Sequence, residues 1–288
     1  MKNKRGVQTM KYLLYNGLAS SGTCKSKAEE YLAKEGEGAE LVDLVGLDIR
    51  EWIKKTTAQD IIILCGGDGT LNHLANDLDG VEIPCPLLHY KAGTGNDFLV
   101  DLEDILGKTD VGPINEYIKN LPTVKVKDIE CKYINGIGYG IDGMCCEYAD
   151  KMRAAGKNKV NYTTLAIRLC LFKYKAPNAT ITIDGEEFKY NRVWLAASMN
   201  GQYYGGGMKV APGQKRNSGK LCLAVVHNLG RLKLLTIFPK IFDGSYVKHE
   251  KHVDLHYGNH IKVAFDAPMA LQIDGETVLD VTEYEVTL

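Results

Sequence analysis

The stretch Ile61-Ile62-Ile63-Leu64-Cys65-Gly66-Gly67-Asp68-Gly69-Thr70 decides the fold that we expect for this chain. Its first five residues are apolar and mostly β-branched, which is typical of a strand buried on both faces of a parallel sheet. The strand runs directly into glycines, and the apolar spacing of Leu71–Leu78 predicts a helix after them. A strand, a glycine turn and a helix in this order predict one unit of an α/β domain.

The sequence on either side continues this alternation. Upstream, strands and helices are predicted in turn at Tyr12–Tyr15, Lys25–Lys34, Glu40–Leu44 and Ile49–Lys55. Downstream, Pro86–His89 predicts a strand that ends at a second glycine loop, Gly93-Thr94-Gly95-Asn96-Asp97. Because helical crossovers between parallel strands are right-handed, we expect a Rossmann-like α/β N-terminal domain with a parallel sheet over residues 1–122.

Strands dominate the sequence after Pro122. Strand-like runs, many separated by Gly or Asp-Gly turns, lie at Lys125–Tyr133, Thr180–Ile183, Arg192–Met199, Leu221–His227, His260–Phe265 and Ala270–Ile273. Helical spacing occurs only at Lys159–Lys173 and Arg231–Asp243. Gly138-Tyr-Gly140-Ile-Asp-Gly143 matches a dinucleotide-binding pattern, but it is interpreted as a turn because no βαβ unit surrounds it. We therefore expect a β-rich, sandwich-like C-terminal domain over residues 123–283, and residues 284–288 could return to the first domain.

Composition excludes several classes of protein. The 35 Lys and Arg residues balance 36 Asp and Glu residues, a formal net charge of −1, so no nucleic-acid partner is indicated. The eight cysteines include no C-x-x-C pair, which favours a reduced, cytoplasmic protein. The opening stretch Met1–Thr9 lacks the apolar segment of a signal peptide, and no apolar run is long enough to span a membrane.

Both glycine loops have the composition of a phosphate-binding site. Glycines let backbone N–H groups approach phosphate oxygens, and the helix predicted from Leu71 would direct its positive end at the same anion. Asp68 could orient a Mg²⁺-bound phosphate, and Thr70 could donate a hydroxyl or cap the helix. Both loops follow strands of one sheet, so we expect them at its carboxyl edge, where open α/β sheets bind ligands. The alternative for each loop is an ordinary turn without a ligand.

The same four residues occur twice in the second half, as Ile183-Asp184-Gly185-Glu186 and Ile273-Asp274-Gly275-Glu276. Asp-Gly supplies the positive φ angles of a type I′ turn, so each copy predicts a β-hairpin. A general base for a substrate hydroxyl is a carboxylate within hydrogen-bond reach of it. Either loop could provide one, and the spacing does not choose between them.

In these motifs the chain resembles the diacylglycerol kinase catalytic-domain family, in particular its bacterial lipid kinases. The matching stretches follow the family's order over nearly the whole chain, at Gly66–Asn72, Gly93–Phe98, Asn135–Gly143, Tyr204–Pro212 and Gln272–Glu276. The resemblance implies a kinase that uses ATP and Mg²⁺, binds ATP between its two domains and transfers the γ-phosphoryl group to a lipid hydroxyl. It also implies a transient contact with a membrane surface. Family members often form dimers, so a homodimer is compatible with the resemblance.

The resemblance also assigns roles to individual residues. The nucleotide is expected to contact Asn16, Gly66, Gly67, Asp68, Gly69, Thr70, Asn72, Gly93, Thr94, Gly95, Asn96 and Asp97. Asp68 and Asp97 are expected to reach Mg²⁺ through the bound ATP. Asp68 is also expected to be catalytic, so Asp68→Asn should abolish transfer while leaving the fold intact. Asp274 and Glu276 are expected to activate the lipid hydroxyl, which selects the second copy of the repeated motif.

One departure from the family concerns a structural metal site. Family members often have Asp-Gly after the Tyr204–Pro212 stretch, where an aspartate and its neighbours hold a structural Mg²⁺. Here residues 215–220 read Lys-Arg-Asn-Ser-Gly-Lys. Hard cations require anionic oxygen ligands, so no structural Mg²⁺ site is predicted at 215–220.

Two basic segments bear on the membrane contact. The first contains Lys151, Arg153, Lys157 and Lys159, and we interpret it as solvated surface. The second contains Lys209, Lys215, Arg216 and Lys220, and we expect it to face acidic lipid. Each basic residue near such a surface contributes about 1 kcal/mol.

Two rival functions stay open. An NAD kinase would share the glycine loop and the β-rich second domain, but that family carries a Gly-Ser-Thr-Ala-Tyr stretch that is not found here. A catalytically silent nucleotide-binding protein is the third interpretation, because the segments 14–22 and 215–220 depart from the family pattern.

Overall fold

The computed structural model describes residues 9–35, 38–157 and 160–288. The chain divides into two compact units, one up to Asn120 and one from Leu121 onward. The sequence placed this boundary two residues later, after residue 122. Lys159 and most of the Met1–Thr9 stretch lie outside the described residues.

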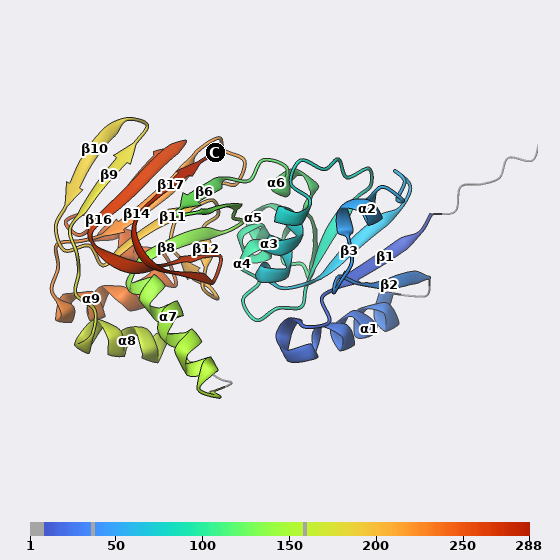
Figure 1. Cartoon of the computed structure of the whole chain (residues 1–288), viewed down its shortest axis with the longest axis horizontal. Coiled ribbons are helices and arrows are strands. Elements are labelled where there is room, and N and C mark those ends of the chain that lie inside the picture. Colours follow the sequence, from blue (N-terminus) through green and yellow to red (C-terminus); the bar gives the residue numbers. More distant parts are fainter. Residues whose placement is uncertain (1–8, 36–37, 158–159) are drawn as a thin grey trace, which may run out of the picture. The chain divides into compact units, whose positions relative to one another are not determined.

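The first unit is an α/β domain built on a five-stranded sheet (Figure 1). Its strands are β1 (Lys11–Tyr15), β2 (Ala39–Asp43), β3 (Ile61–Gly66), β4 (Leu87–Lys91) and β5 (Val111–Pro113), in the order β2-β1-β3-β4-β5. The first four are parallel, and the short edge strand β5 is antiparallel to β4. The helices are α1 (Cys24–Glu35), α2 (Ile49–Ile53), α3 (Asp68–Asp77), α4 (Asp97–Asp101), α5 (Glu103–Leu106) and α6 (Asn115–Ile118). The predicted α/β class is confirmed, and only β5 departs from a parallel sheet.

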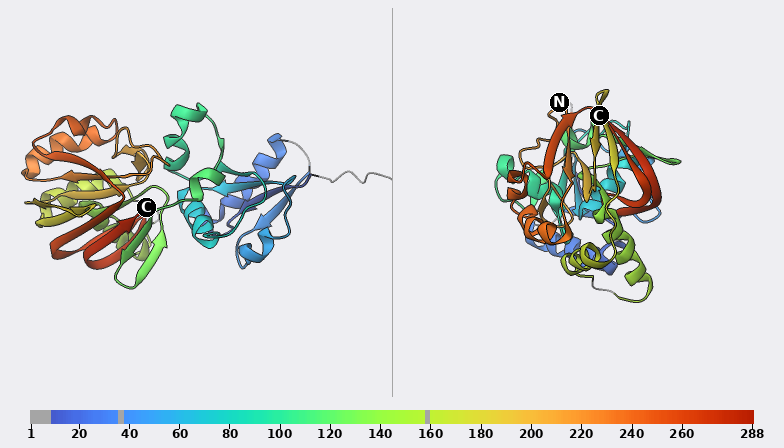
Figure 2. Two further views of the ribbon diagram at one scale, coloured as in Figure 1. Left: turned by 90° about the horizontal axis from the view of Figure 1, so that it is seen from above. Right: turned by 90° about the vertical axis from the view of Figure 1, so that its left-hand side faces the viewer.

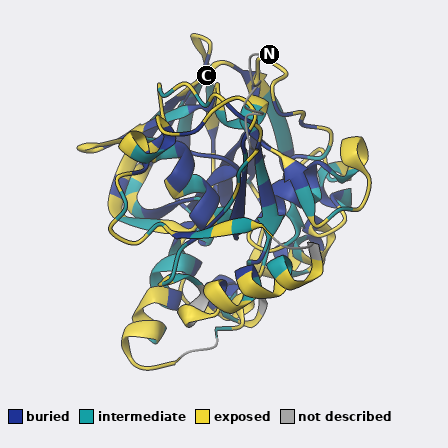
Figure 3. Cartoon of the chain, turned by 90° about the vertical axis from the view of Figure 1, so that its right-hand side faces the viewer, coloured by how far each residue is buried: buried dark blue, intermediate teal, exposed yellow. Residues whose placement is uncertain are grey.

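Strand β3 is buried on both faces, as its apolar run predicts. Ile63 and Cys65 share a core cluster with Leu13 of β1 and Ala28 of α1. Successive side chains of a strand point to opposite faces, so Ile62, which is fully buried, faces the other side of the sheet. Figure 3 shows the same division, with dark blue strands inside and yellow outer faces on the helices.

The second unit is built on a ten-stranded antiparallel sheet (Figure 2). Its strands are β6 (Thr123–Val126), β7 (Ile129–Lys132), β8 (Gly136–Gly140), β9 (Ala179–Ile183), β10 (Glu186–Tyr190), β11 (Leu195–Met199), β14 (Leu221–Val226), β15 (Val253–Gly258), β16 (His260–Ile273) and β17 (Glu276–Thr287). A separate short hairpin joins β12 (Tyr203–Tyr204) to β13 (Met208–Lys209). The helices are α7 (Ile141–Ala154), α8 (Tyr162–Phe172) and α9 (Arg231–Ile237), and no helix among the described residues is long and apolar enough to cross a membrane.

Strand β14 explains why an antiparallel sheet contains a continuous apolar run. Leu223 and Val225 pack into a core formed between strands, whereas Cys222 and Ala224 pack into a second core with residues of α7, α8 and α9. Both faces of the strand are therefore buried. This arrangement confirms the predicted sandwich-like second domain.

The strands expected in the second unit are present, but the structure divides and joins them differently in three places. Lys125–Tyr133 is a hairpin of β6 and β7, because Lys127 adopts a positive φ of 54° and turns the chain. His260–Phe265 and Ala270–Ile273 are one strand, β16, which bends at register shifts against β17. The chain end does not return to the first unit, since Glu285 pairs with Lys125 and β17 completes the second sheet.

The glycine motif of residues 138–143 is also not a simple turn. It links β8 to α7 through Gly140, whose φ is 106°. Helix α7 was missed because Gly143 and adjacent cysteines lower its helix propensity. Gly143 lets the helix approach the backbone of Ala270 in β16 more closely than any side chain would permit.

Candidate active site

The two glycine loops of the first unit touch each other. They follow the neighbouring strands β3 and β4, and the amide of Ala92 donates to the carbonyl of Gly66 at 2.8 Å. A Cβ atom added to Gly93 would lie 2.5 Å from the Cα of Gly67. Real Cβ atoms do not approach backbone so closely, so both positions require glycine. The predicted meeting of the two loops at one sheet edge is therefore confirmed by a direct backbone contact.

Asp68 connects the first loop to the second. One of its carboxylate oxygens accepts the amide of Asp97 at 2.9 Å, and the other accepts the amide of Phe98 at 3.0 Å. An asparagine at position 68 would present an N–H group to one of these donors. The expectation that Asp68→Asn leaves the fold intact stays a prediction, but these contacts indicate that the substitution costs stability, because the carboxylate itself holds the second loop.

Asn96 closes the second loop from within. Its φ is 55°, a left-handed conformation that asparagine tolerates better than most residues. The side chain accepts the amide of Gly93 at 3.0 Å and donates to the carbonyl of Gly93 at 3.1 Å. Asp97 follows as the first residue of α4, and it is 3% exposed. Thr94 remains exposed at the tip of the loop.

The other residues expected at the nucleotide lie near the same edge. Asn16 directly follows β1, which pairs with β3, and its side chain accepts the amide of Leu18 at 2.9 Å. Gly69 is exposed, and a Cβ atom there would meet nothing within 4 Å. Thr70 is buried, and Asn72 accepts a hydrogen bond from the side chain of Asn76. Helix α3 starts at Asp68, three residues before the predicted start, so Thr70 lies inside the helix rather than at its cap.

His89 is a site residue that the sequence did not reveal. It lies in β4 beneath the first loop, fully buried, with Nε2 at 3.1 Å from the carbonyl of Gly66. Burial lowers the pKa of His89, so the ring is neutral and Nε2 carries the donated proton. Its Nδ1 atom has no hydrogen-bond partner within the described parts of the chain. A histidine inside an apolar strand run was the available signal.

The second copy of the repeated motif forms the predicted type I′ turn between β16 and β17. The φ angles of Asp274 and Gly275 are 46° and 98°. The carboxylate of Asp274 accepts the amides of Ile134 at 2.5 Å, Asn135 at 2.9 Å and Gly136 at 3.0 Å. The side chain of Glu276, by contrast, is exposed and has no hydrogen-bond or ion-pair partner among residues 9–35, 38–157 and 160–288.

The first copy uses the same local device. Asp184 and Gly185 have φ angles of 49° and 92°, and the Asp184 carboxylate accepts the amides of Asn259 and His260. These backbone donors lower the pKa of Asp184. The two hairpins are therefore alike locally and differ in which strand their aspartate holds: Asp184 holds the start of β16, and Asp274 holds the start of β8.

A further carboxylate adjoins the Asp274 turn. Asp142, half-buried in the first turn of α7, accepts from Nε2 of Gln272 at 2.9 Å, and Oε1 of Gln272 accepts the amide of Gly275 at 2.7 Å. Burial raises the pKa of Asp142 to about 6, although hydrogen bonds from Gln272 and Tyr204 oppose the rise. Asp142 was not predicted as a site residue because the motif that contains it was interpreted as a turn.

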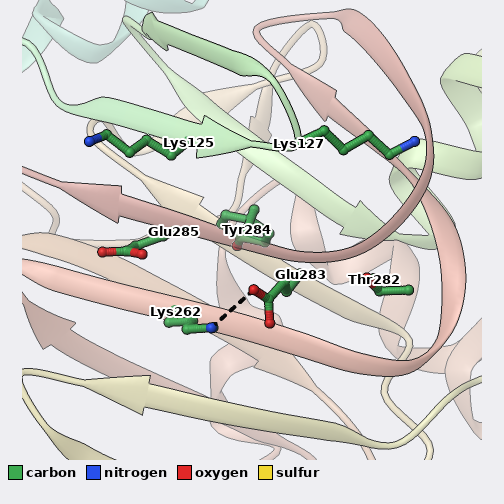
Figure 4. Close-up of a pocket in the computed structure, with 7 residues that line it drawn as sticks. All are labelled: Lys125, Lys127, Lys262, Thr282, Glu283, Tyr284 and Glu285. Carbon is green, nitrogen blue, oxygen red and sulfur yellow. Dashed lines mark hydrogen bonds and ion pairs between the residues drawn. The ribbon is translucent and has the colours of Figure 1, made fainter.

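One pocket of about 330 Å³ in the second unit is a poor candidate for a lipid site (Figure 4). It is lined mainly by charged side chains from β6, β16 and β17. Lys262 and Glu283 form an ion pair across it at 3.1 Å, while Lys125 and Lys127 extend in opposite directions. A lipid tail needs apolar walls, which these residues do not supply.

Comparisons with known proteins identify the family of the chain. The sequence profile of the diacylglycerol kinase catalytic domain matches residues 12–126. That of the YegS C-terminal NAD kinase beta sandwich-like domain matches residues 135–285, more than half of the chain.

Relatives and a solved structure resemble the chain over most of its length. The chain is 25% identical over 248 residues to a diacylglycerol kinase of Mycobacterium tuberculosis (strain ATCC 25618 / H37Rv), covering 82% of this chain and 79% of the relative. It is 23% identical over 223 residues to a diacylglycerol kinase of Bacillus subtilis (strain 168), covering 75% and 71%. A crystal structure of a diacylglycerol kinase from Bacillus anthracis str. Sterne shares the fold with a TM-score of 0.58 at 19% identity, covering 99% of this chain and 95% of that one. The chain therefore belongs to the diacylglycerol kinase catalytic-domain family, with a second domain of the YegS type.

Proposed function

We propose that this protein is an ATP- and Mg²⁺-dependent lipid kinase that transfers the γ-phosphoryl group of ATP to a lipid hydroxyl. The observation that carries the proposal is the contact between Gly67 and Gly93, which joins two glycine loops at one sheet edge in a chain of this family. Two adjacent backbone segments that carry no side chains can both donate N–H groups to the oxygens of one polyphosphate. A single turn would offer fewer such donors.

The first unit binds the nucleotide phosphates in this proposal. Gly67 and Gly69, which are not buried, leave backbone uncovered at the start of the ten-residue helix α3, whose N-terminal end favours an anion. Thr94 and Gly95 present the tip of the second loop. Asp68 holds the two loops at a constant separation through its bonds to the amides of Asp97 and Phe98.

Asp68 and Asp97 are the residues that would hold Mg²⁺. Each Asp68 oxygen accepts one amide and keeps a second lone pair, so the carboxylate fits a metal ligand as well as a loop clamp. Mg²⁺ is usually bound through one or two carboxylates together with substrate phosphates, a small donor set that these two residues supply. When bound, Mg²⁺·ATP supplies the phosphoryl group and neutralises part of its charge.

The second unit supplies the carboxylate that accepts the lipid proton. The hydroxyl oxygen forms a bond to the γ-phosphorus as the bond to the ADP oxygen breaks, and the hydroxyl proton passes to the Asp274-Gly275-Glu276 turn. A carboxylate offers about four lone-pair sites, of which Asp274 uses three on backbone amides. Asp274 therefore holds the turn, and Glu276 presents the less encumbered carboxylate.

Part of the second basic segment faces acidic lipid in the proposal. Lys215 and Lys220 are exposed, whereas Arg216 is 9% exposed and bonded inside the protein, so Arg216 does not belong to this surface. In the first basic segment Lys151 pairs with Glu147 and Arg153 pairs with Asp150, which favours solvated surface there.

The proposal is tested by incubating the full chain with radiolabelled ATP, Mg²⁺ and a panel of lipids and NAD. The expected product is a lipid that carries the radiolabelled phosphoryl group. Glu276→Gln should lower the rate by about 10²–10⁴, as expected for a lost proton acceptor. Asp274→Asn should also lower it, because it loosens the turn that carries Glu276, whereas Asp184→Asn, which disturbs a locally matching turn, should leave it within a few-fold. Labelled NADP would favour an NAD kinase, and absence of any labelled product would favour a silent nucleotide-binding protein. Equal rate losses in the two aspartate variants would contradict the assigned role of the second turn.

A further inference from the structure

Arg216 is the one lysine or arginine among the described residues whose side chain is buried. It lies in the loop between β13 and β14, the segment at which the sequence departs from the family and no structural Mg²⁺ site is predicted. Its Nη2 atom donates to Oδ1 of Asn135 at 2.5 Å, and its Nη1 atom donates to the carbonyl of Ile134. The guanidinium is thus hydrogen-bonded to the segment that leads into β8.

The same segment is held from its other side by Asp274. The Asp274 carboxylate accepts hydrogen bonds from the amides of Ile134 and Asn135. Arg216 donates to the carbonyl of Ile134 and to the side chain of Asn135. An anion therefore faces the N–H groups, and a cation faces the oxygens. Hydrogen bonds to charged groups are roughly twice as strong as neutral ones, so the two ions together fix this short segment.

Two uncharged polar side chains hold backbone carbonyls of the same segment and loop. Asn200 donates to the carbonyl of Ile134 at 3.0 Å, and Gln214 donates to the carbonyls of Lys220 at 2.7 Å and Asn200 at 3.4 Å. Both side chains are buried. A buried guanidinium stays charged, and burial of a charge is unfavourable unless its hydrogen bonds are satisfied. This loop therefore contains a site built for a cation.

A divalent metal does not fit that site. Residues 213–220 contain no aspartate or glutamate, and a second positive charge beside Arg216 would be repelled. Across the described residues, no group of three or more His, Cys, Asp or Glu side chains is placed to hold a metal ion. The guanidinium already donates to the oxygens on which a cation in this loop would depend.

We propose that Arg216 is a built-in replacement for the structural divalent ion, and that it positions the Asp274-Gly275-Glu276 turn through the Ile134–Asn135 segment. Its effect on catalysis rests on the function proposed above, whereas its effect on local structure does not. Because it does not touch the reacting atoms, Arg216 is a positioning residue. The fold of the second unit would consequently be independent of Mg²⁺.

The test compares the full chain with Arg216→Ala, Arg216→Lys and a control, Arg231→Ala. Arg231 also donates to two backbone carbonyls, those of Cys170 and Tyr174, but it has no contact with Ile134 or Asn135. Thermal unfolding is measured in EDTA and in excess Mg²⁺, and amide hydrogen exchange is followed in peptides covering residues 133–137 and 272–277. Steady-state kinetics with lipid and ATP give kcat and KM separately.

Unfolding of the second unit, followed by fluorescence of its buried Trp194 in a Trp52→Phe background, should be the same in EDTA and in Mg²⁺. Arg216→Ala should exchange its 133–137 amides about 10- to 100-fold faster, the range expected for lost hydrogen bonds to a charged group. Its kcat should fall while KM for ATP stays near normal. Methylguanidinium, but not Mg²⁺, should restore part of the exchange protection and of kcat. Arg231→Ala should leave exchange at 133–137 and kcat unchanged.

Several results would overturn the proposal. They are stabilisation of the second unit of the wild type by Mg²⁺, rescue of Arg216→Ala by Mg²⁺, or the same local exchange in Arg216→Ala and Arg231→Ala. If Arg216→Ala does not fold, Arg216→Lys takes its place, since one ammonium group cannot make both hydrogen bonds of the guanidinium in the same geometry. Wild-type hydrogen exchange at residues 133–137 in Arg216→Lys would also contradict the proposal. A wild type without lipid kinase activity would reject the proposed function, and the unfolding and exchange measurements would still decide the role of Arg216.

Discussion

Asp68→Asn should cost the first unit stability as well as activity. In the wild type the two carboxylate oxygens accept the amides of Asp97 and Phe98 at 2.9 and 3.0 Å. Asparagine keeps one acceptor and places an NH₂ group against the other amide. Loss of a hydrogen bond to a charged acceptor costs about 1.5–3 kcal/mol, and the remaining bond weakens to a neutral one, so the total is about 2–4 kcal/mol.

The assay isolates the first unit by using its tryptophan. Trp52 lies in α2 of the first unit, and Trp194, the other tryptophan of the chain, is buried in the second. In a Trp194→Phe background, urea unfolding followed by fluorescence reports the first unit alone. Asp77→Asn is the control, because Asp77 is an exposed residue at the end of the same helix α3.

We expect a lower unfolding midpoint for Asp68→Asn and faster hydrogen exchange at the amides of Asp97 and Phe98. The Asp77→Asn protein should unfold within about 0.5 kcal/mol of the background. Wild-type stability and wild-type exchange in Asp68→Asn, together with lost phosphoryl transfer, would refute the clamp. Asp68 would then act on the ligand alone, as the sequence had suggested.

Three further predictions test other parts of the structure. Gly93→Ala should lower the melting temperature by the equivalent of about 1–3 kcal/mol, because its Cβ would meet Gly67 backbone at 2.5 Å; an equally stable variant would contradict the loop contact. Asp142 has a native pKa of about 6 against 3.8 when unperturbed, so the native state binds its proton more tightly and stability falls as pH rises from about 4 to 6. Asp142→Asn should remove that loss, worth up to about 3 kcal/mol at neutral pH, and an unchanged stability–pH curve would reject the shift. Glu276→Gln should lower kcat by about 10²–10⁴ with no change in melting temperature, whereas Asp274→Asn should lower both; a rate loss in Asp274→Asn alone would make Asp274 the proton acceptor.

Segments with a strong local signal were predictable. The apolar run of β3 and the glycines that follow it predicted a buried parallel strand, because burial on both faces removes the need for polar alternation. The repeated Asp-Gly pairs predicted two type I′ turns, since the turn chemistry is contained in two residues. Helix α7 was missed because its stability comes from packing against β16 rather than from its own propensity.

Roles that depend on long-range hydrogen bonds were not predictable. Asp68 has the composition of a ligand-binding residue, and only the fold brings its carboxylate to amides 29 and 30 positions away. Arg216 looks like one more surface cation in a basic loop, yet its partners lie 81 and 82 positions upstream. A sequence window carries no information about such pairings.

The sequence by itself determined the two-domain α/β and β-rich architecture, the two glycine loops and their placement at the end of neighbouring strands. These features follow from local periodicity and from backbone conformations that only certain residues adopt. Tertiary structure alone decided that Gly67 and Gly93 touch and that Asp68 and Asp274 each hold a distant backbone segment. It alone placed one arginine of the basic loop inside the protein. The physical reason is that a charged side chain has the same local propensity whether it meets water or a buried peptide group, and only the assembled fold determines which partner it meets.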